Sequence, residues 1–372
     1  MTSRERLLAA LRSETPDRVP VTLYESSPYN DGWPNREPSY APLLALEREY
    51  GDTFVRAPID VPILFGDPNA VTGLEERNVD GSIMRVHEVD TPRGPLRSVA
   101  RRDPGLMTYW QIEPFVKSDA DIERVLAMPT APAEVNIPRL RDLEARVGDH
   151  GLLLFSIGDA LGHVVGLFEF EDFVMRCATD DGPIRALPDK VQEQVLRAIR
   201  MIGNHVKNAA FRLWGPEYCG APLMNPRVYF PRYVVQYDQP ATQAIHETGN
   251  FSVIHCHGRL RDLLTPIAEI GADALEPVET LPLTSADVTL AEVKKCLGQR
   301  MCIMGGIQAV TLETGSPETV RQEVQTALAQ GAPGGRYVAL PTAGPFMVPL
   351  DPRALANAEV MFRTVHEHGR YG

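Results

Sequence analysis

Short apolar runs of strand length alternate along the chain with amphipathic helical patterns, and this alternation restricts the fold more than any other feature. A helical segment between two strands is the connection that parallel strands need, and residues 260–270, closed by Gly271, show such a pattern. The 372 residues suffice for an eight-stranded barrel with insertions. We therefore predict an α/β protein, a single (β/α)₈ TIM barrel over residues 1–372. The eight predicted strands are 19–24, 53–57, 152–157, 209–214, 251–255, 274–278, 301–304 and 337–340.

Two segments lie outside this alternation. Thr2 and Glu5 form a capping-box pattern ahead of apolar residues at helical spacing, which predicts an N-terminal helix. Residues 71–111 alternate between apolar and polar positions around the turn 91–94, which is typical of a β-hairpin. We expect an insertion at about 65–115 that packs on the barrel and is not a second domain.

The composition excludes several classes of function. Asp and Glu outnumber Lys and Arg by 49 to 37, which argues against nucleic acid or an anionic membrane as the main partner. Residues 151–168 are nearly apolar, but Asp159 and His163 interrupt them, so we predict no membrane span. Five cysteines without paired spacing and a charged start unlike a signal peptide favour a cytoplasmic protein. Neither a P-loop nor a strand-GxGxxG-helix unit supports a nucleotide site.

His255 and His257 are the strongest local signal for chemistry. They end a predicted strand, where residues two apart point to the same face, so both imidazoles project together while Cys256 points away. Two convergent imidazoles are half of a tetrahedral Zn²⁺ site, and Gly258 allows a sharp turn afterwards. The alternative is that one histidine caps the next helix and the other packs in the barrel.

A third metal ligand is predicted in the segment that follows the preceding strand. Glu217 offers a hard oxygen and Cys219 a soft sulfur, both near the end of a neighbouring strand. Taken alone, each is equally well explained as a solvated loop carboxylate or a buried thiol. Glu276 or Glu279 is the expected acidic partner of an imidazole.

Other polar residues also follow predicted strands, where barrel enzymes carry their reacting groups. Asp60 and Asp159 are candidate acids or substrate anchors, although each could equally be a helix N-cap. The predicted substrate-binding residues are Glu25, Tyr218, Glu279 and Gln308, the last because Gly305 and Gly306 allow a close backbone approach.

The order and spacing of several segments resemble the uroporphyrinogen decarboxylase superfamily. The resemblance covers nearly the whole chain and implies the (β/α)₈ fold, an enzyme acting on a small molecule, and a homodimer. The segments are RERLLAALRSETPDRVPV (4–21), GPEYCGAPLMNP (215–226), IHCHGRLRDLL (254–264), GADALEPVE (271–279), MGGIQ (304–308) and APGGRYVAL (332–340).

The superfamily includes porphyrinogen decarboxylases and zinc-dependent, corrinoid-linked methyltransferases, and the chain departs from both patterns. The decarboxylases bind substrate carboxylates with arginines after the first strand, whereas residues 25–31 contain none, although Asp60 could stand for their aspartate. The methyltransferases carry His-x-Cys where this chain has His255 and His257, and a late cysteine where residues 340–344 have no thiol.

The resemblance therefore implies a divergent, methyltransferase-like enzyme that binds Zn²⁺ through His255 and His257 and works with a corrinoid protein or another methyl carrier. A harder, less thiolate-rich metal site suits polarised oxygen or bound water better than thiol activation. The alternatives are a metal-independent decarboxylase or lyase for a small carboxylated substrate, with Asp60 as acid and base, and a non-catalytic ligand-binding barrel.

Overall fold

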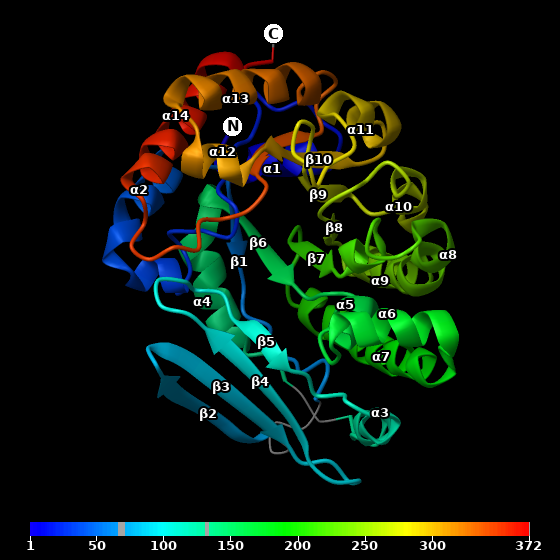
Figure 1. Ribbon diagram of the computed structural model, residues 1–372. Helices are drawn as coiled ribbons and strands as arrows, with labels where there is room; N and C mark the ends of the chain where they lie inside the picture. The colour runs from blue at the N-terminus through cyan, green and yellow to red at the C-terminus, as the bar shows by residue number, and fades with distance from the viewer. Residues whose placement is uncertain (66–70, 131–133, 372) are drawn as a thin grey trace.

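The computed structural model describes residues 1–65, 71–130 and 134–371, and its centre is a curled parallel sheet of seven strands. Neighbours in the sheet follow chain order, and helices surround it on the outside (Figure 1). Seven of the eight predicted strands are present, with ends that differ by at most three residues. The strands are β1 (Thr53–Arg56), β6 (Gly151–Ser156), β7 (Ala210–Trp214), β8 (Phe251–His255), β9 (Ala274–Val278), β10 (Cys302–Ile307) and β11 (Tyr337–Pro341).

The first predicted strand, residues 19–24, forms a single parallel bridge and not an extended strand. Val21 pairs with Ala339 of β11, and on its other side the Val21 carbonyl accepts a hydrogen bond from the Asp52 amide at 2.7 Å. The Val21 amide, however, donates to the Asp52 carboxylate at 3.1 Å, where a ladder would use a backbone carbonyl. The segment thus lies between β11 and β1, but side chains replace part of the expected ladder.

Two buried carboxyl side chains make this junction between residues 19–24 and β1. Glu47 accepts a hydrogen bond from the Leu23 amide at 2.9 Å and from the Thr53 hydroxyl at 2.7 Å. Asp52 is fully buried and pairs with the guanidinium groups of Arg6 and Arg18. Loss of either acid would leave buried donors without acceptors, which costs about 1–3 kcal/mol per group.

Several helices begin at a residue whose side chain caps them, among them α1, α4 and α5. In α1 the Thr2 hydroxyl accepts from the Glu5 amide at 3.2 Å and the Glu5 carboxylate accepts from the Thr2 amide at 2.8 Å, which confirms the predicted capping box. The helices are α1 (Ser3–Leu11), α2 (Ala41–Tyr50), α3 (Asp119–Leu126), α4 (Ile137–Val147), α5 (Ala160–Val165), α6 (Phe170–Thr179), α7 (Gly182–Gly203), α8 (Pro226–Phe230), α9 (Gln236–Glu247), α10 (Leu264–Ile270), α11 (Leu290–Leu297), α12 (Ala309–Thr314), α13 (Pro317–Gly331) and α14 (Pro352–His368).

The predicted insertion contains a separate antiparallel sheet of four strands. It consists of β2 (Val71–Val79), β3 (Ser82–Val89), β4 (Leu96–Arg102) and β5 (Trp110–Glu113), in that order. The predicted turn 91–94 connects β3 to β4. The sheet lies beside the curled sheet (Figure 1), and a bridge between Leu106 and Met347 joins the insertion to the segment after β11. The predicted start of the insertion overlaps residues 66–70, which lie outside the described residues.

Apolar side chains fill the interior of the curled sheet toward the amino ends of its strands, and polar side chains replace them toward the carboxyl ends. Leu154, Ala210, Val253 and Ala274 belong to one buried cluster inside the sheet, and Leu7 of α1 packs beneath it. Because side chains alternate along a strand, the next inward position after Ala210 is Arg212. No helix within the described residues is long and apolar enough to cross a membrane.

Candidate active site

The polar layer is built from three neighbouring strands. Arg212 on β7, His255 on β8 and Glu276 on β9 are 3%, 7% and 4% exposed. The guanidinium Nε of Arg212 lies 2.5 Å from Glu276 Oε1, and the same guanidinium pairs with Glu25 at 2.5 Å. His255 Nδ1 lies 3.3 Å from Glu276 Oε1. One buried arginine therefore contacts two carboxylates, and one of these also orients a histidine.

The charges of this layer are fixed by their partners. Burial alone would raise the pKa of Glu276, but Arg212 and His255 outweigh burial and lower that pKa to about 2. Burial likewise would lower the pKa of Arg212, and Glu276 and Glu25 raise it instead. Both groups are thus ionised at neutral pH. Because two carboxylates neutralise the single arginine, it offers little charge to an anionic substrate.

The two predicted imidazoles do project together. The ring centroids of His255 and His257 lie 4.8 Å apart at an interplanar angle of 82°, while the intervening Cys256 is fully buried. His257 Nδ1 lies 2.7 Å from Glu279 Oε1, and the Ser285 hydroxyl donates to the other oxygen of Glu279 at 2.6 Å. Burial lowers the pKa of His257, but Glu279 outweighs burial and raises it.

Each imidazole therefore has a carboxylate at Nδ1, as the sequence predicted for Glu276 or Glu279. A carboxylate there favours the tautomer with the proton on Nδ1, which leaves the Nε2 lone pair for a proton, a substrate or a metal ion. Within the described residues, neither Nε2 atom has a hydrogen-bond partner. The same arrangement is found around histidines that bind zinc.

The other two predicted metal ligands are less favourably placed. Cys219 is fully buried with its sulfur 3.9 Å from that of Met224. Glu217 is partly exposed, and its carboxylate accepts a hydrogen bond from the Gly215 amide at 3.2 Å. In the described part of the chain, no group of three or more His, Cys, Asp or Glu side chains is arranged to hold a metal ion. The site thus supplies two suitable nitrogens without a third assembled ligand, and Zn²⁺ stays a prediction.

Asp159 lies where a helix cap was the alternative interpretation, and it does cap α5. Its Oδ1 accepts the Gly162 amide at 2.5 Å, and the side chain is buried. Beside it lies Asp238 of α9, which is fully buried and which the sequence analysis missed. A charged residue inside a helix gives no local sign of burial, so only its apolar neighbours Tyr237 and Ala241 could have indicated it.

The remaining predicted site residues are spread over the strand ends. Glu25 belongs to the arginine layer described above. Tyr218 is partly buried with its ring 5.9 Å from that of Phe170. Gln308 lies elsewhere: its amide nitrogen donates to Thr280 at 3.1 Å, and it lines a cavity of about 320 Å³ between α11 and α13. Its side chain was predicted to line the substrate pocket, but Gln308 directly follows the last residue of β10 and its side chain lies against Thr280, beside α11 and α13.

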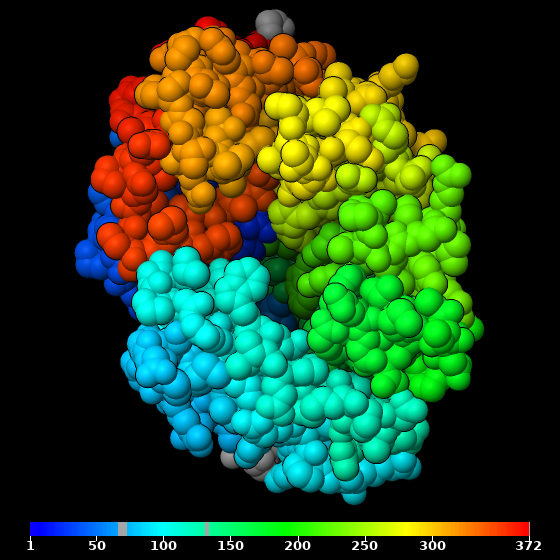
Figure 2. All heavy atoms as spheres, viewed as in Figure 1, coloured from blue at the N-terminus to red at the C-terminus, as the bar shows by residue number. Residues whose placement is uncertain are grey.

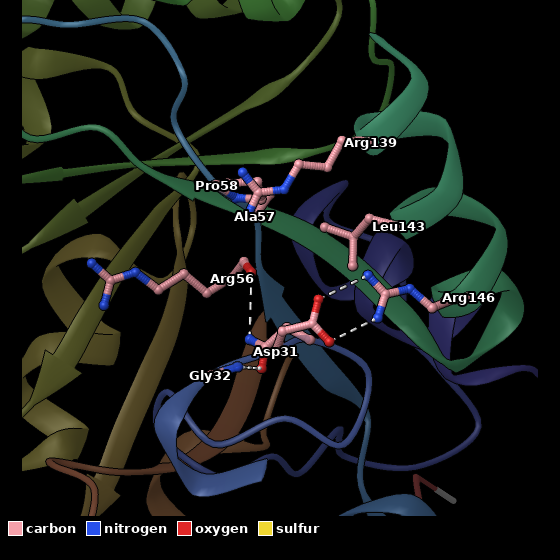
Figure 3. A pocket seen from close by; sticks show the side chains of 9 residues that line it. Asp31, Gly32, Arg56, Ala57, Pro58, Arg139, Leu143 and Arg146 are labelled. Atoms are coloured by element: carbon pink, nitrogen blue, oxygen red, sulfur yellow. Dashed lines mark hydrogen bonds and ion pairs between the residues drawn. The ribbon is translucent and has the colours of Figure 1, made fainter. Parts of the chain in front are cut away.

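Asp60 pairs with Arg139 of α4 at 3.2 Å and is not joined to the imidazoles by any contact among the described residues. A nearby cavity of about 230 Å³ lies between residues 30–32, the end of β1 and α4 (Figure 3). Arg56, Arg139 and Arg146 line it, and Asp31 pairs with Arg146 at 3.3 Å. Arginines are therefore present near the segment that follows the first predicted strand, residues 19–24, but they come from β1 and α4.

A hollow opens the molecule toward the strand ends. Figure 2 shows it in the middle of the viewed face, bordered by the insertion (cyan), by α5 and α6 (green) and by the segments after β9 and β10 (yellow and orange). In Figure 1 the strands β6, β7 and β8 lie behind this hollow. Asp159, Glu217 and His257 belong to the segments that follow these strands.

Residues 221–368 match the family model for uroporphyrinogen decarboxylase. The match includes His255, His257, Glu276 and Glu279, and it confirms the superfamily that the sequence segments indicated. No curated protein matches the sequence.

Two solved structures are similar to this chain. A methyltransferase from Methanosarcina mazei is 17% identical, with a TM-score of 0.64 and coverage of 99% of both chains, so the fold is shared over the full length. A D-psicose 3-epimerase from Clostridium cellulolyticum H10, solved with D-tagatose, is 8% identical with a TM-score of 0.39, covering 63% of this chain and 84% of the other.

Proposed function

We propose that this protein is a methyltransferase of the uroporphyrinogen decarboxylase superfamily, with His255 and His257 at the reacting centre. The observation that carries the proposal is the pair of adjacent imidazoles, each with a carboxylate at Nδ1 and an open Nε2. The fold shared with a methyltransferase over 99% of the chain supports it. We also infer that residues 19–24 complete the curled sheet as an eight-stranded barrel, supported by the Val21–Ala339 bridge.

Methylation of an oxygen, nitrogen or sulfur acceptor releases a proton, and the chain's own residues can take it. The Nε2 atom of His257 would accept the proton, and Glu279 would stabilise the imidazolium that forms. Glu276 holds His255 in its tautomer, and Arg212 keeps Glu276 ionised. Tyr218 and Glu217 would contact the substrate from the neighbouring segment.

In the alternative state with a metal, Zn²⁺ would occupy the Nε2 lone pairs of His255 and His257, so His257 would then be a ligand and not the proton acceptor. Glu217 is the candidate third ligand and Cys219 the alternative, and the ion would supply a Lewis acid that favours the ionised acceptor. A corrinoid protein or another methyl carrier is the proposed methyl donor, by family analogy. The experiment below tests the metal separately from the reaction.

A second candidate is a metal-independent decarboxylase or lyase for a small carboxylated substrate. The cavity beside Asp60, lined by Arg56, Arg139 and Arg146, favours it, because arginines bind carboxylates in a bidentate manner. Each of these arginines already has a carboxylate within 3.3 Å, which reduces the charge available for a substrate. We therefore rank this function second.

The test combines metal analysis with a methyl-transfer assay on the full chain. We expect the purified protein to retain about one equivalent of Zn²⁺ and to demethylate methylcobalamin in the presence of phenol, thiol or amine acceptors, assayed in parallel. His255→Ala and His257→Ala should lose both properties, while His368→Ala, an exposed histidine of α14, should keep them. Bound zinc that both site variants retain, or demethylation unchanged in them, would refute the proposal. Decarboxylation that Asp60→Asn alone abolishes would favour the second candidate.

A further inference from the structure

Two buried carboxyl groups meet between the end of β6 and α9. Asp159 is 1% exposed and Asp238 is 0% exposed. The Gly162 amide donates to Oδ1 of Asp159. Within the described residues, no donor reaches Oδ2 of Asp159 or either oxygen of Asp238, so three of four carboxyl oxygens lack a partner other than the facing acid.

The two side chains lie within hydrogen-bonding reach of each other. Carboxylates only accept hydrogen bonds, so a bond between two carboxyl groups requires a proton on one of them. Two ionised carboxylates in contact, without a cation and out of water, would each carry a desolvation cost of several kcal/mol. One shared proton removes one charge and supplies the missing donor, as in paired catalytic aspartates.

We propose that Asp159 and Asp238 share a single proton and that this proton-sharing pair holds the segment Gly215–Cys219 in place. The proposal does not depend on which reaction the enzyme catalyses. It makes Asp238 a positioning residue, since it acts through Asp159 and does not reach the hollow.

The backbone of Gly215, which begins the segment Gly215–Cys219, lies directly against Asp159. Gly215 has φ +138°, and a Cβ atom there would lie only 2.0 Å from Oδ1 of Asp159, so main chain and carboxyl are in close contact. The same segment carries Glu217 and Tyr218. An added charge on the pair would repel Glu217, whose carboxylate already raises the pKa of both aspartates.

The pKa directions agree with the geometry. Burial raises the pKa of Asp159 well above its usual range, and the facing Asp238 adds to this effect. Burial raises the pKa of Asp238 as well. The groups around the pair come from three elements: Glu217, Tyr218 and Cys219 from Pro216–Cys219, His163 from α5, and Cys256 after β8.

Infrared spectroscopy of the full chain tests the shared proton, because a protonated carboxyl has a C=O stretching band that an ionised one lacks. Glu47 supplies the calibration: burial raises its pKa to about 8, so the difference between wild type and Glu47→Gln near pH 6.5 measures one protonated carboxyl. In the Glu47→Gln background we expect one further buried equivalent. It should disappear in both Asp159→Asn and Asp238→Asn, where the new amide donates to the remaining carboxylate.

Several spectral outcomes would overturn the proposal. A Glu47→Gln protein with no band from the pair would show two ionised carboxylates, and one with two equivalents would show two acids. A band that survives in either asparagine variant would assign the proton to one residue alone. Circular dichroism of each variant establishes that the spectra come from folded protein.

Amide hydrogen exchange tests the positioning role. In Asp238→Ala, which removes the facing carboxyl group and its hydrogen bond, residues 215–220 should exchange about tenfold faster than in wild type. The junction at Val21 and Asp52 is the internal control and should be unchanged. Equal exchange of residues 215–220 in the two proteins would contradict the role in positioning.

Discussion

Arg212 should be the most sensitive position in the active-site layer, and Arg212→Met tests this directly. The substitution leaves Glu276, which is 4% exposed, as an ionised group without its cation. Folding lowers the pKa of Glu276 from 4.5 to about 2, which corresponds to about 3 kcal/mol of stability at neutral pH. Breaking a buried ion pair by removing one partner costs about 3–5 kcal/mol, so both routes give a similar loss.

The design is a double-mutant cycle measured by urea unfolding. Arg212→Met alone should lower the free energy of unfolding by about 3–5 kcal/mol, and Arg212→Met combined with Glu276→Leu should recover most of it, because apolar residues of similar volume replace a buried pair at little cost. Since the pKa of Glu276 is lowered, its contribution is present above pH 4.5 and is lost as the pH falls toward about 2.

Tryptophan fluorescence and circular dichroism should report the same unfolding transition in each protein of the cycle. A loss below about 1 kcal/mol in Arg212→Met would refute the reasoning. A double variant no more stable than Arg212→Met would refute it too, because the cost would then not come from the unpaired Glu276.

Three further changes have defined outcomes. Asp52→Ala should lower the free energy of unfolding by about 3–5 kcal/mol, because Arg6 and Arg18 lose their buried partner, whereas exposed Asp149→Ala should stay within about 0.5 kcal/mol in the same urea titration. Gly215→Ala should lower the free energy of unfolding by at least about 1–3 kcal/mol, because Gly215 has φ +138° and contacts Asp159. Gly334→Ala, at φ +78° in open space, should lower it by about 1 kcal/mol. Thermal unfolding compares the two variants, and equal losses of stability would exclude the contact. Asp273 raises the pKa of His246, so the ion pair stabilises the fold fully below pH 6.5 and loses this effect as the pH rises through the higher pKa of the folded state. The pH dependence of the melting temperature above pH 6.5 should therefore change in His246→Gln, and an unchanged dependence would contradict this role.

Local periodicity was sufficient to predict much of the molecule. Strands 251–255 and 274–278 have the predicted ends because apolar runs bounded by Asn250, Gly271 and Asp273 leave few alternatives. The alternation of side chains along a strand also placed His255 and His257 together with Cys256 on the opposite face. Of their carboxylate partners, Glu276 lies on the next strand and Glu279 directly follows it, so the register of the two strands brings them close.

Contacts between distant segments could not be predicted in this way. Arg212 lies within an apolar run, and its partners Glu25 and Glu276 are 187 and 64 residues away in the sequence. The useful signal was a charge at an inward position of a strand, because a buried charge needs a partner. The pairing of Asp159 with Asp238 depends in the same way on how α9 packs. The first strand was predicted as an ordinary one because a pattern cannot reveal that Asp52 replaces a backbone acceptor.

The junction formed by Glu47 and Asp52 makes the position of residues 19–24 depend on two side chains at and just after the end of α2. Backbone ladders join strands of almost any composition, but this joint exists only where two particular acids face their donors. Transplanting the first 24 residues of this chain into a homologue should therefore succeed only if the recipient has acids at the positions equivalent to Glu47 and Asp52. Natural variation in this part of the chain should be concerted, with changes at the opening segment accompanied by changes about thirty residues later.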